Sequence, residues 1–204
     1  MSGTYYFRIA LYAGALTPML HVLVLILSGQ DPISTPISQL SQGKYGDLHA
    51  LGLALFGAAH FAMALGFRRI DRGRMWPWAR IVLVFSGLAV WYIAGFYKEA
   101  DPERLLGPEA NDPLWIAACL TGVAMGMLQP GLSRRSKSIG LFSAVCLGLW
   151  FLLIPLILLV NDSWIGAYER VVGFVYVTWV VGISYAILHQ HIEPYPKPPL
   201  TDTF

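Results

Sequence analysis

The stretch Ile139–Val160, IGLFSAVCLGLWFLLIPLILLV, decides the fold class of this chain. It contains no charged side chain, and a run of about 20 apolar residues is long enough to cross a hydrocarbon core of about 30 Å. A backbone in lipid has no water to bond with, so it must satisfy its own hydrogen bonds. The stretch therefore predicts a transmembrane helix.

Five more apolar runs of comparable length divide the rest of the chain. Charged residues make up only 13% of the 204 residues, about half of the roughly 25% that soluble domains carry. The sequence therefore predicts an all-α polytopic membrane protein, a bundle of six transmembrane helices. We expect a single six-helix domain over residues 1–204, with a short cytoplasmic tail at 190–204. The predicted spans are Phe7–Leu27, Leu48–Phe67, Ile81–Phe96, Leu114–Leu128, Ile139–Val160 and Val171–Leu188.

The charges in the connections predict the orientation of the bundle. Basic residues crowd the connection after the second run, where 68–74 reads RRIDRGR, and the connection after the fourth, where 134–137 reads RRSK. Acidic residues gather in the alternate connections, as in 99–103, EADPE. Positively charged loops stay on the cytoplasmic side of a membrane, so we expect both termini to be cytoplasmic and the acidic loops to face outward.

The connection between the first two runs is the least generic segment of the chain. Residues 32–49, PISTPISQLSQGKYGDLH, alternate hydroxyl and amide groups with apolar residues. We expect Ile37 and Leu40 to anchor this loop on the outer mouth of the bundle, where Ser38 and Ser41 cap a helix or bind a ligand. Trp91 and Trp179 lie deeper in their runs and are two further candidate ligand-binding residues, with plain packing as the alternative.

Two predicted outer helix starts carry the candidate catalytic residues. Asp47 and His49 open the second helix, and Glu169 and Arg170 open the sixth. Carboxylates also suit a helix N-terminus because the dipole there is positive, so capping is the alternative interpretation. A cation inside a span is costly unless it is paired or reaches the interface, and we expect Arg170 to pair with Asp47.

No carboxylate is predicted at midplane depth, so histidine is the group available there for acid–base or ligand chemistry. His21 and His60 could hold a haem or a pigment, although a hydrogen bond to a neighbouring helix is the more ordinary role. Their predicted depths differ by roughly 8 Å at 1.5 Å per residue, which does not suit a haem held between the two. The chain has no His-Glu-x-x-His, Cys-x-x-Cys or nucleotide-binding motif, so we expect no metal, no other cofactor and no nucleic acid.

Two short motifs resemble a known family. The stretch 37–41, ISQLS, is followed by a helix rich in small residues, and the stretch 166–170, GAYER, is followed by an aromatic-rich last helix. This combination resembles a prokaryotic membrane family catalogued as domain of unknown function 998. The resemblance implies a six-helix integral membrane fold in the plasma (inner) membrane of a prokaryote, and it implies no activity.

The sequence leaves three functions open. The favoured one is a non-catalytic membrane protein that binds a lipid or another apolar partner, or that serves as an accessory subunit of other membrane proteins. The second is a small membrane enzyme acting on a lipid or isoprenoid at the outer leaflet, with Asp47, His49 and Glu169 as acid–base groups and Arg170 holding an anion. A transporter is the third, and the lack of a carboxylate at midplane depth argues against it.

Overall fold

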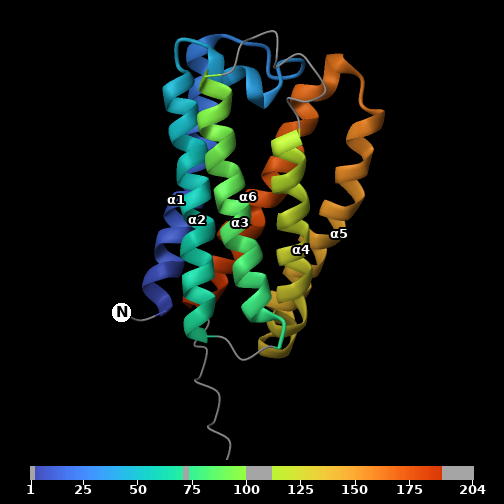
Figure 1. The fold of residues 1–204 in the computed structure, drawn as a ribbon. Coiled ribbons are helices and arrows are strands. Elements are labelled where there is room, and N and C mark those ends of the chain that lie inside the picture. The colour runs from blue at the N-terminus through green and yellow to red at the C-terminus, as the bar shows by residue number, and fades with distance from the viewer. Residues whose placement is uncertain (1–2, 71–73, 100–111, 190–204) are drawn as a thin grey trace, which may run out of the picture.

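Six long helices form the bundle that the computed structural model describes over residues 3–70, 74–99 and 112–189 (Figure 1). Each is long and apolar enough to cross a membrane, which confirms the predicted six-helix membrane fold. The side of the membrane on which each end of the bundle lies stays a prediction. The helices are α1 (Gly3–Ser28), α2 (Gly46–Ile70), α3 (Trp76–Glu99), α4 (Asp112–Arg135), α5 (Lys137–Leu156) and α6 (Ile165–His189).

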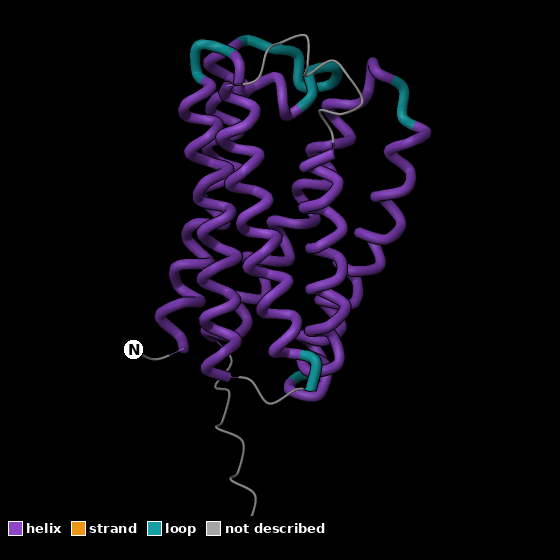
Figure 2. The backbone as a smooth tube through the Cα atoms, viewed as in Figure 1, coloured by secondary structure: helices purple, strands orange, loops and turns teal. Residues whose placement is uncertain are grey.

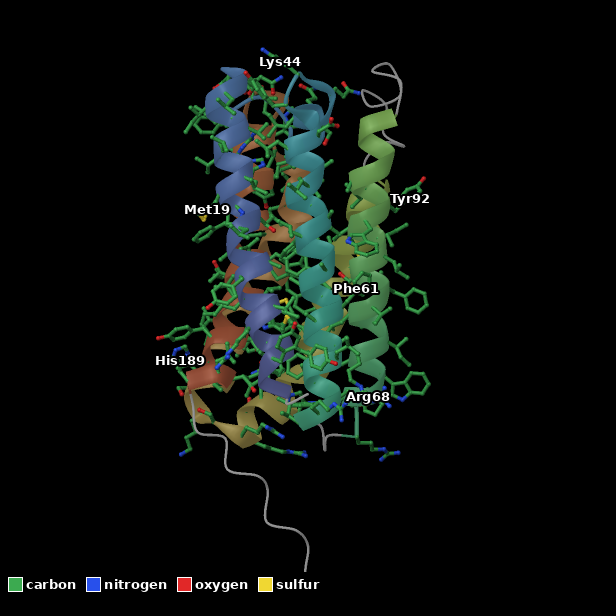
Figure 3. The ribbon with its side chains drawn as sticks, turned by 90° about the vertical axis from the view of Figure 1, so that its left-hand side faces the viewer. Met19, Lys44, Phe61, Arg68, Tyr92 and His189 are labelled. Carbon is green, nitrogen blue, oxygen red and sulfur yellow. The ribbon has the colours of Figure 1, made fainter. Side chains whose placement is uncertain are left out.

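The two ends of the bundle differ in their connections. Short 3₁₀ helices at one end, which we name the loop end, are η1 (Ile37–Gln42) between α1 and α2, and η4 (Ile157–Leu159) and η5 (Asp162–Trp164) between α5 and α6 (Figure 2). The opposite end, which we name the arginine end, carries Arg68 and Arg69 of α2 and Arg134 and Arg135 of α4. Lys44 and Arg68 mark the loop end and the arginine end in Figure 3.

The helices close into a ring in chain order. Each helix packs against the next, α6 packs against α1 to complete the ring, and α6 also touches α2. In the apolar 18-residue stretch of α2 that could span the membrane, 56% of the residues are buried, against 22% in the corresponding stretch of α1. Because α2 lies so deep, its polar side chains must find partners inside the protein and not in lipid or water.

An arginine closes the inner packing at the arginine end. The Arg135 side chain of α4 donates a hydrogen bond to the carbonyl oxygen of Ile70, the last residue of α2. The same guanidinium lies over the ring of Trp76, 5.4 Å from its centroid. The last carbonyls of a helix lack partners within the helix, so Arg135 both caps α2 and fixes its end against α3 and α4.

The helix ends differ from the predicted span limits at the bundle's two surfaces. Helix α6 begins at Ile165, well before the predicted Val171, and α4 continues past Leu128 to Arg135. Helix α5 ends earlier than predicted, at Leu156, directly after Pro155. Hydropathy detects only the part of a helix that lies in hydrocarbon, whereas hydrogen bonding continues the helix into the polar interface. The early start of α6 places Glu169 and Arg170 one turn inside a helix.

Candidate functional site

The connection between α1 and α2 folds back over the loop end. Residues 31–42, which we name the loop cap, end in η1, where the exposed fraction of Leu40 is 1% and that of Ser41 is 3%. The backbone N–H of Ala167 donates to the carbonyl oxygen of Ile33 at 2.8 Å, so the loop cap is tied to the first turn of α6. Buried Leu40 and the hydrogen bond between Ala167 and Ile33 therefore anchor this loop on the bundle.

Glu169 holds the start of η1. Its Oε2 accepts a hydrogen bond from the backbone N–H of Ile37 at 2.6 Å, and the carboxylate is buried. The first N–H groups of a helix need an acceptor from outside it, and Glu169 supplies one to η1. Glu169 thus joins α6 to η1, and one of its two carboxylate oxygens is engaged with the loop cap.

Arg170 holds the other half of the loop cap. Its Nη1 donates to the carbonyl oxygens of Pro32 and Thr35, at 2.9 and 2.8 Å. These backbone carbonyls, and not the expected Asp47, are the contacts that the structure gives for Arg170; the Asp47 side chain is exposed. The Nε and Nη2 atoms of Arg170 are buried without a hydrogen-bond partner. One edge of the guanidinium is therefore unused.

A buried serine–histidine contact lies below η1. Ser41 Oγ is 2.7 Å from His49 Nδ1, and the side chain of His49 is 2% exposed. The His21 ring lies beside the His49 ring, with centroids 5.4 Å apart, and His21 Nε2 is buried without a partner. The contact joins η1 to α2, and a serine hydroxyl beside an imidazole is also the pair that activates a nucleophile.

Asp31 begins the loop cap with a compact turn. Its carboxylate accepts hydrogen bonds from the Ser34 hydroxyl and from the backbone N–H groups of Ile33 and Ser34. The hydrogen bond from the Ser34 side chain, with the two backbone N–H groups, holds the pKa of Asp31 below its usual value, and the nearby charge of Arg170 acts in the same direction. Asp31 is therefore the carboxylate at the exposed edge of this cluster.

Two glycines permit the close approach of the loop cap to the helices. A Cβ on Gly46 would collide with the backbone carbonyl of Ser41, and a Cβ on Gly166 would collide with the carbonyl of Thr35. In each case the obstacle is backbone, which cannot rotate away as the end of a side chain can. The close packing of the loop cap against the starts of α2 and α6 therefore depends on these glycines.

An open groove adjoins the same end of α6. Its volume is about 450 Å³, and its lining is almost entirely apolar. Trp164, at the rim of this groove, is 61% exposed. The groove lies at the connection from η4 through η5 into α6, and its walls come from this connection and the first two turns of α6. Its lining residues are Val160, Asn161, Trp164, Ala167, Tyr168 and Val171.

A second polar cluster lies inside the ring, away from the loop cap. His60 bonds Tyr176 through Nε2, the Tyr176 hydroxyl lies 2.9 Å from Ser86 Oγ, and Ser86 Oγ lies 3.0 Å from Thr121 Oγ1. His60 Nδ1 is 2.7 Å from the carbonyl oxygen of Phe56. Because a carbonyl only accepts, Nδ1 donates, and a neutral His60 then accepts a hydrogen bond from the Tyr176 hydroxyl at Nε2. The cluster links α2, α3, α4 and α6 by side-chain hydrogen bonds.

The structure brings some of the predicted site residues together and separates others. His49, Glu169, Arg170 and Ser41 all contact the loop cap or belong to it, whereas the side chain of Ser38 lies outside the described side chains. Trp179 is fully buried and donates to Ser143 Oγ at 3.1 Å. Trp91 is 47% exposed and donates to the carbonyl of Ala54 at 2.8 Å.

Neither of the deep histidines has the surroundings expected for shared cofactor binding. The His21 ring neighbours His49, and both ring nitrogens of His60 are in hydrogen bonds, so a metal or haem iron at His60 would have to displace one of them. Among the described residues, no three His, Cys, Asp or Glu side chains gather closely enough to hold a metal ion.

Sequence reasoning missed several partners in these clusters. Tyr176 and Ser86 look like ordinary residues of apolar helices, and Asp31 looks like a surface residue of a loop. The polar residues that face inward on α3 and α6 had a weak signal, since serine in a span has to bond with something. The carbonyls of Pro32 and Thr35 had no sequence signal, because any residue supplies a backbone acceptor.

Comparison with known proteins gives a family but no relative of known activity. No curated protein and no solved structure matches the chain. The model of the family described as "Protein of unknown function (DUF998)" matches residues 11–186. That match covers most of the chain and five of the six helices in full or nearly so, including the loop cap and the α6 residues that hold it. This multi-pass membrane protein therefore belongs to the DUF998 family.

Proposed function

We propose that this chain is a non-catalytic membrane protein that binds a lipid at the loop end of its bundle. The observation that carries the proposal is the apolar groove of about 450 Å³ beside the start of α6. Ligand sites of a few hundred Å³ with mostly apolar walls are typical for small apolar molecules. A groove that lies at the end of a membrane-spanning helix suits the acyl chain of a lipid, which is present in the bilayer at high concentration.

The polar residues near the groove support binding over catalysis. The Glu169 carboxylate and the Arg170 Nη1 atom are both engaged with backbone groups of the loop cap. An acid–base catalyst needs a proton-transferring atom within reach of a substrate, and these atoms instead hold a loop. Their chemistry is that of a structural clamp, which favours a lipid-binding protein or an accessory subunit of a membrane complex.

The same proposal includes an orientation. The basic residues at the arginine end favour the cytoplasmic side, which puts both chain ends there and places the loop cap and the groove at the outer leaflet. The family resemblance favours the plasma (inner) membrane of a prokaryote. A lipid bound at the groove would then come from the outer leaflet of that membrane.

Lipid retention during purification tests the proposal. The protein is purified in a mild detergent, washed extensively and analysed by native mass spectrometry for bound lipid. Val171, which lines the groove, and Val145, on the exposed surface of α5, have similar exposed fractions of 51% and 53%. We expect Val171→Trp to remove the retained lipid and Val145→Trp to keep it. If the wild type retains no lipid, or both variants retain it equally, lipid binding at this groove is wrong.

The contact between Ser41 and His49 favours one second candidate, a serine hydrolase acting on a lipid ester. At 2.7 Å, His49 is within hydrogen-bonding reach of the Ser41 proton, which is the arrangement of a nucleophile and its base. A fluorophosphonate probe distinguishes this candidate from the first. Covalent labelling at Ser41 that disappears in both Ser41→Ala and His49→Phe supports a hydrolase, and no labelling of a protein that retains lipid supports a binding protein.

A further inference from the structure

The unused edge of Arg170 stands out among the buried polar groups at the loop end. Its Nη1 already serves two carbonyls, while Nε and Nη2 are buried with no partner, and so is Nε2 of His21. Arg170 Nη1 bonds the carbonyl of Pro32, the residue after Asp31, and His21 packs against His49 below η1, so these side chains lie at the same end of the bundle. Buried polar groups are normally hydrogen-bonded, so these unpartnered nitrogens at the loop end point to a missing acceptor.

The donors on this edge match one class of acceptor. A guanidinium presents Nε and Nη2 as a fork that binds two oxygens of a phosphate or a carboxylate together. An anion with several oxygens also suits the nearby His21 Nε2, provided that this nitrogen carries the proton. A phosphate ester therefore fits the three nitrogens better than a hydroxyl or an amide, each of which presents a single oxygen.

The carboxylates around Arg170 select among phosphate esters. Asp31 lies at the exposed edge of the cluster and Glu169 directly precedes Arg170 in α6, so two carboxylates already accompany the guanidinium. A ligand with a net negative charge would add repulsion here. A headgroup that carries an ammonium beside its phosphate would place the phosphate on Arg170 and the ammonium toward Asp31, with opposite charges facing each other at both points.

The groove supplies the apolar half of the same ligand. Ala167 and Val171, which line the groove, lie three residues before and one residue after Arg170 on α6. At 3.6 residues per turn they lie about 60° and about 100° around the helix from Arg170, so the groove is on the neighbouring face of α6 and a lipid bound to both would cross between the two faces. Resting on the lipid-binding function proposed above, we propose that the ligand is a zwitterionic aminophospholipid. Its phosphate binds the free edge of Arg170 with His21, its ammonium faces Asp31, and one acyl chain lies in the groove.

Headgroup competition tests this assignment on the full-length protein in detergent. Native mass spectrometry measures the binding of dioleoyl phosphatidylethanolamine, dioleoyl phosphatidylglycerol and dioleoylglycerol, which share acyl chains and differ in the headgroup. We expect the wild type to prefer phosphatidylethanolamine over dioleoylglycerol by about tenfold, the scale of one charge-assisted hydrogen-bonded contact. Inorganic phosphate is added in a separate arm.

Two variants locate the selectivity. Arg170→Gln removes the cation, and His21→Phe removes one nitrogen while keeping a ring against His49. We expect both to lose the preference for phosphatidylethanolamine over dioleoylglycerol while still binding the latter, and Arg134→Gln at the arginine end to keep the wild-type preference. His21→Phe removes none of the hydrogen bonds that hold the loop cap, so it answers the question even if Arg170→Gln fails to fold.

The possible failures are separable. Equal binding of phosphatidylethanolamine and dioleoylglycerol by the wild type would overturn the headgroup assignment and leave lipid binding standing. A preference for phosphatidylglycerol over phosphatidylethanolamine would overturn the pairing of the ammonium with Asp31. Stabilisation by inorganic phosphate that Val171→Trp leaves unchanged would show a free phosphate site in place of a lipid site. If none of the three lipids binds, the proposed function itself is wrong.

Discussion

Replacing Tyr176 by phenylalanine isolates one hydroxyl group in the centre of the bundle. The ring would keep its contacts with Phe56 and Trp150, whose ring centroids lie 4.6 and 5.3 Å from that of Tyr176. Only the hydrogen bonds to His60 and Ser86 are lost. The variant therefore measures hydrogen bonding with little change in apolar packing.

The structure sets the size of the effect. Ser86 would keep its contact with Thr121, whereas Nε2 of His60, a residue that is fully buried, would have no other partner among its described contacts. A buried polar group without a partner costs about 1–3 kcal/mol, and hydrogen bonds between membrane helices contribute roughly 0.6 kcal/mol on average. We therefore expect Tyr176→Phe to lower the free energy of unfolding by about 1–2 kcal/mol.

Reversible unfolding in mixed detergent micelles measures this difference. Tyr185→Phe is the matched control, because Tyr185 lies on the same helix with a side chain that is 54% exposed. A destabilisation of 1.4 kcal/mol shifts the folding equilibrium about tenfold, which such titrations resolve. If the two variants unfold at the same detergent fraction, the buried hydroxyl adds nothing to stability and the account of the polar cluster as a link between four helices is wrong.

Three further predictions address the loop end and the orientation. Gly166→Ala should destabilise the protein, because the added Cβ would meet the Thr35 carbonyl. Gly173→Ala on the same helix, where a Cβ would have nothing within 4 Å, should be neutral or stabilising by up to about 1 kcal/mol. Thermal melting in detergent compares the two variants, and equal melting temperatures would contradict the close packing of the loop cap. The labelling test uses a background in which Cys119 and Cys146 are replaced by serine. In it, Gln42→Cys should react with an impermeant thiol reagent on intact cells, and Ser138→Cys should react only after permeabilisation. The reverse pattern would invert the proposed orientation. Because the folded pKa of Asp31 lies below its unfolded value, the stability that its turn contributes is present above about pH 4 and is lost as the pH falls through the folded pKa. Asp31→Asn should therefore weaken the fall of the melting temperature at acid pH. If the melting temperature falls as steeply in the variant as in the wild type, the Asp31 turn is not the cause of that fall.

The helical fold was predictable because one strong force determines it. Each span is a predominantly apolar run with few charges, and the bilayer converts such a run into a helix whatever its neighbours do. The limits of the helices were less predictable for the same reason, since α6 starts at Ile165 in a polar segment where hydropathy carries no signal.

The candidate site was predictable only in part. A polar residue in or near a span needs a partner, so Glu169, Arg170 and His49 could be singled out one by one. Their partners are a backbone N–H, two backbone carbonyls and a serine hydroxyl. Sequence reasoning assigned Arg170 to Asp47 because it looked for an opposite charge at equal depth, and it overlooked that a folded-back loop offers carbonyl oxygens at the same place.

The bond between Glu169 and Ile37 also constrains the order in which the protein can be completed. The two residues are 132 positions apart in the chain, and a ribosome adding roughly 5–20 residues per second takes on the order of ten seconds to cover that distance. During that interval the first two helices can be in the membrane while the N–H of Ile37 still lacks its acceptor. The segment joining the first two helices therefore reaches its final form only after the last helix has been inserted, and a nascent chain truncated before α6 should leave this segment open to added protease.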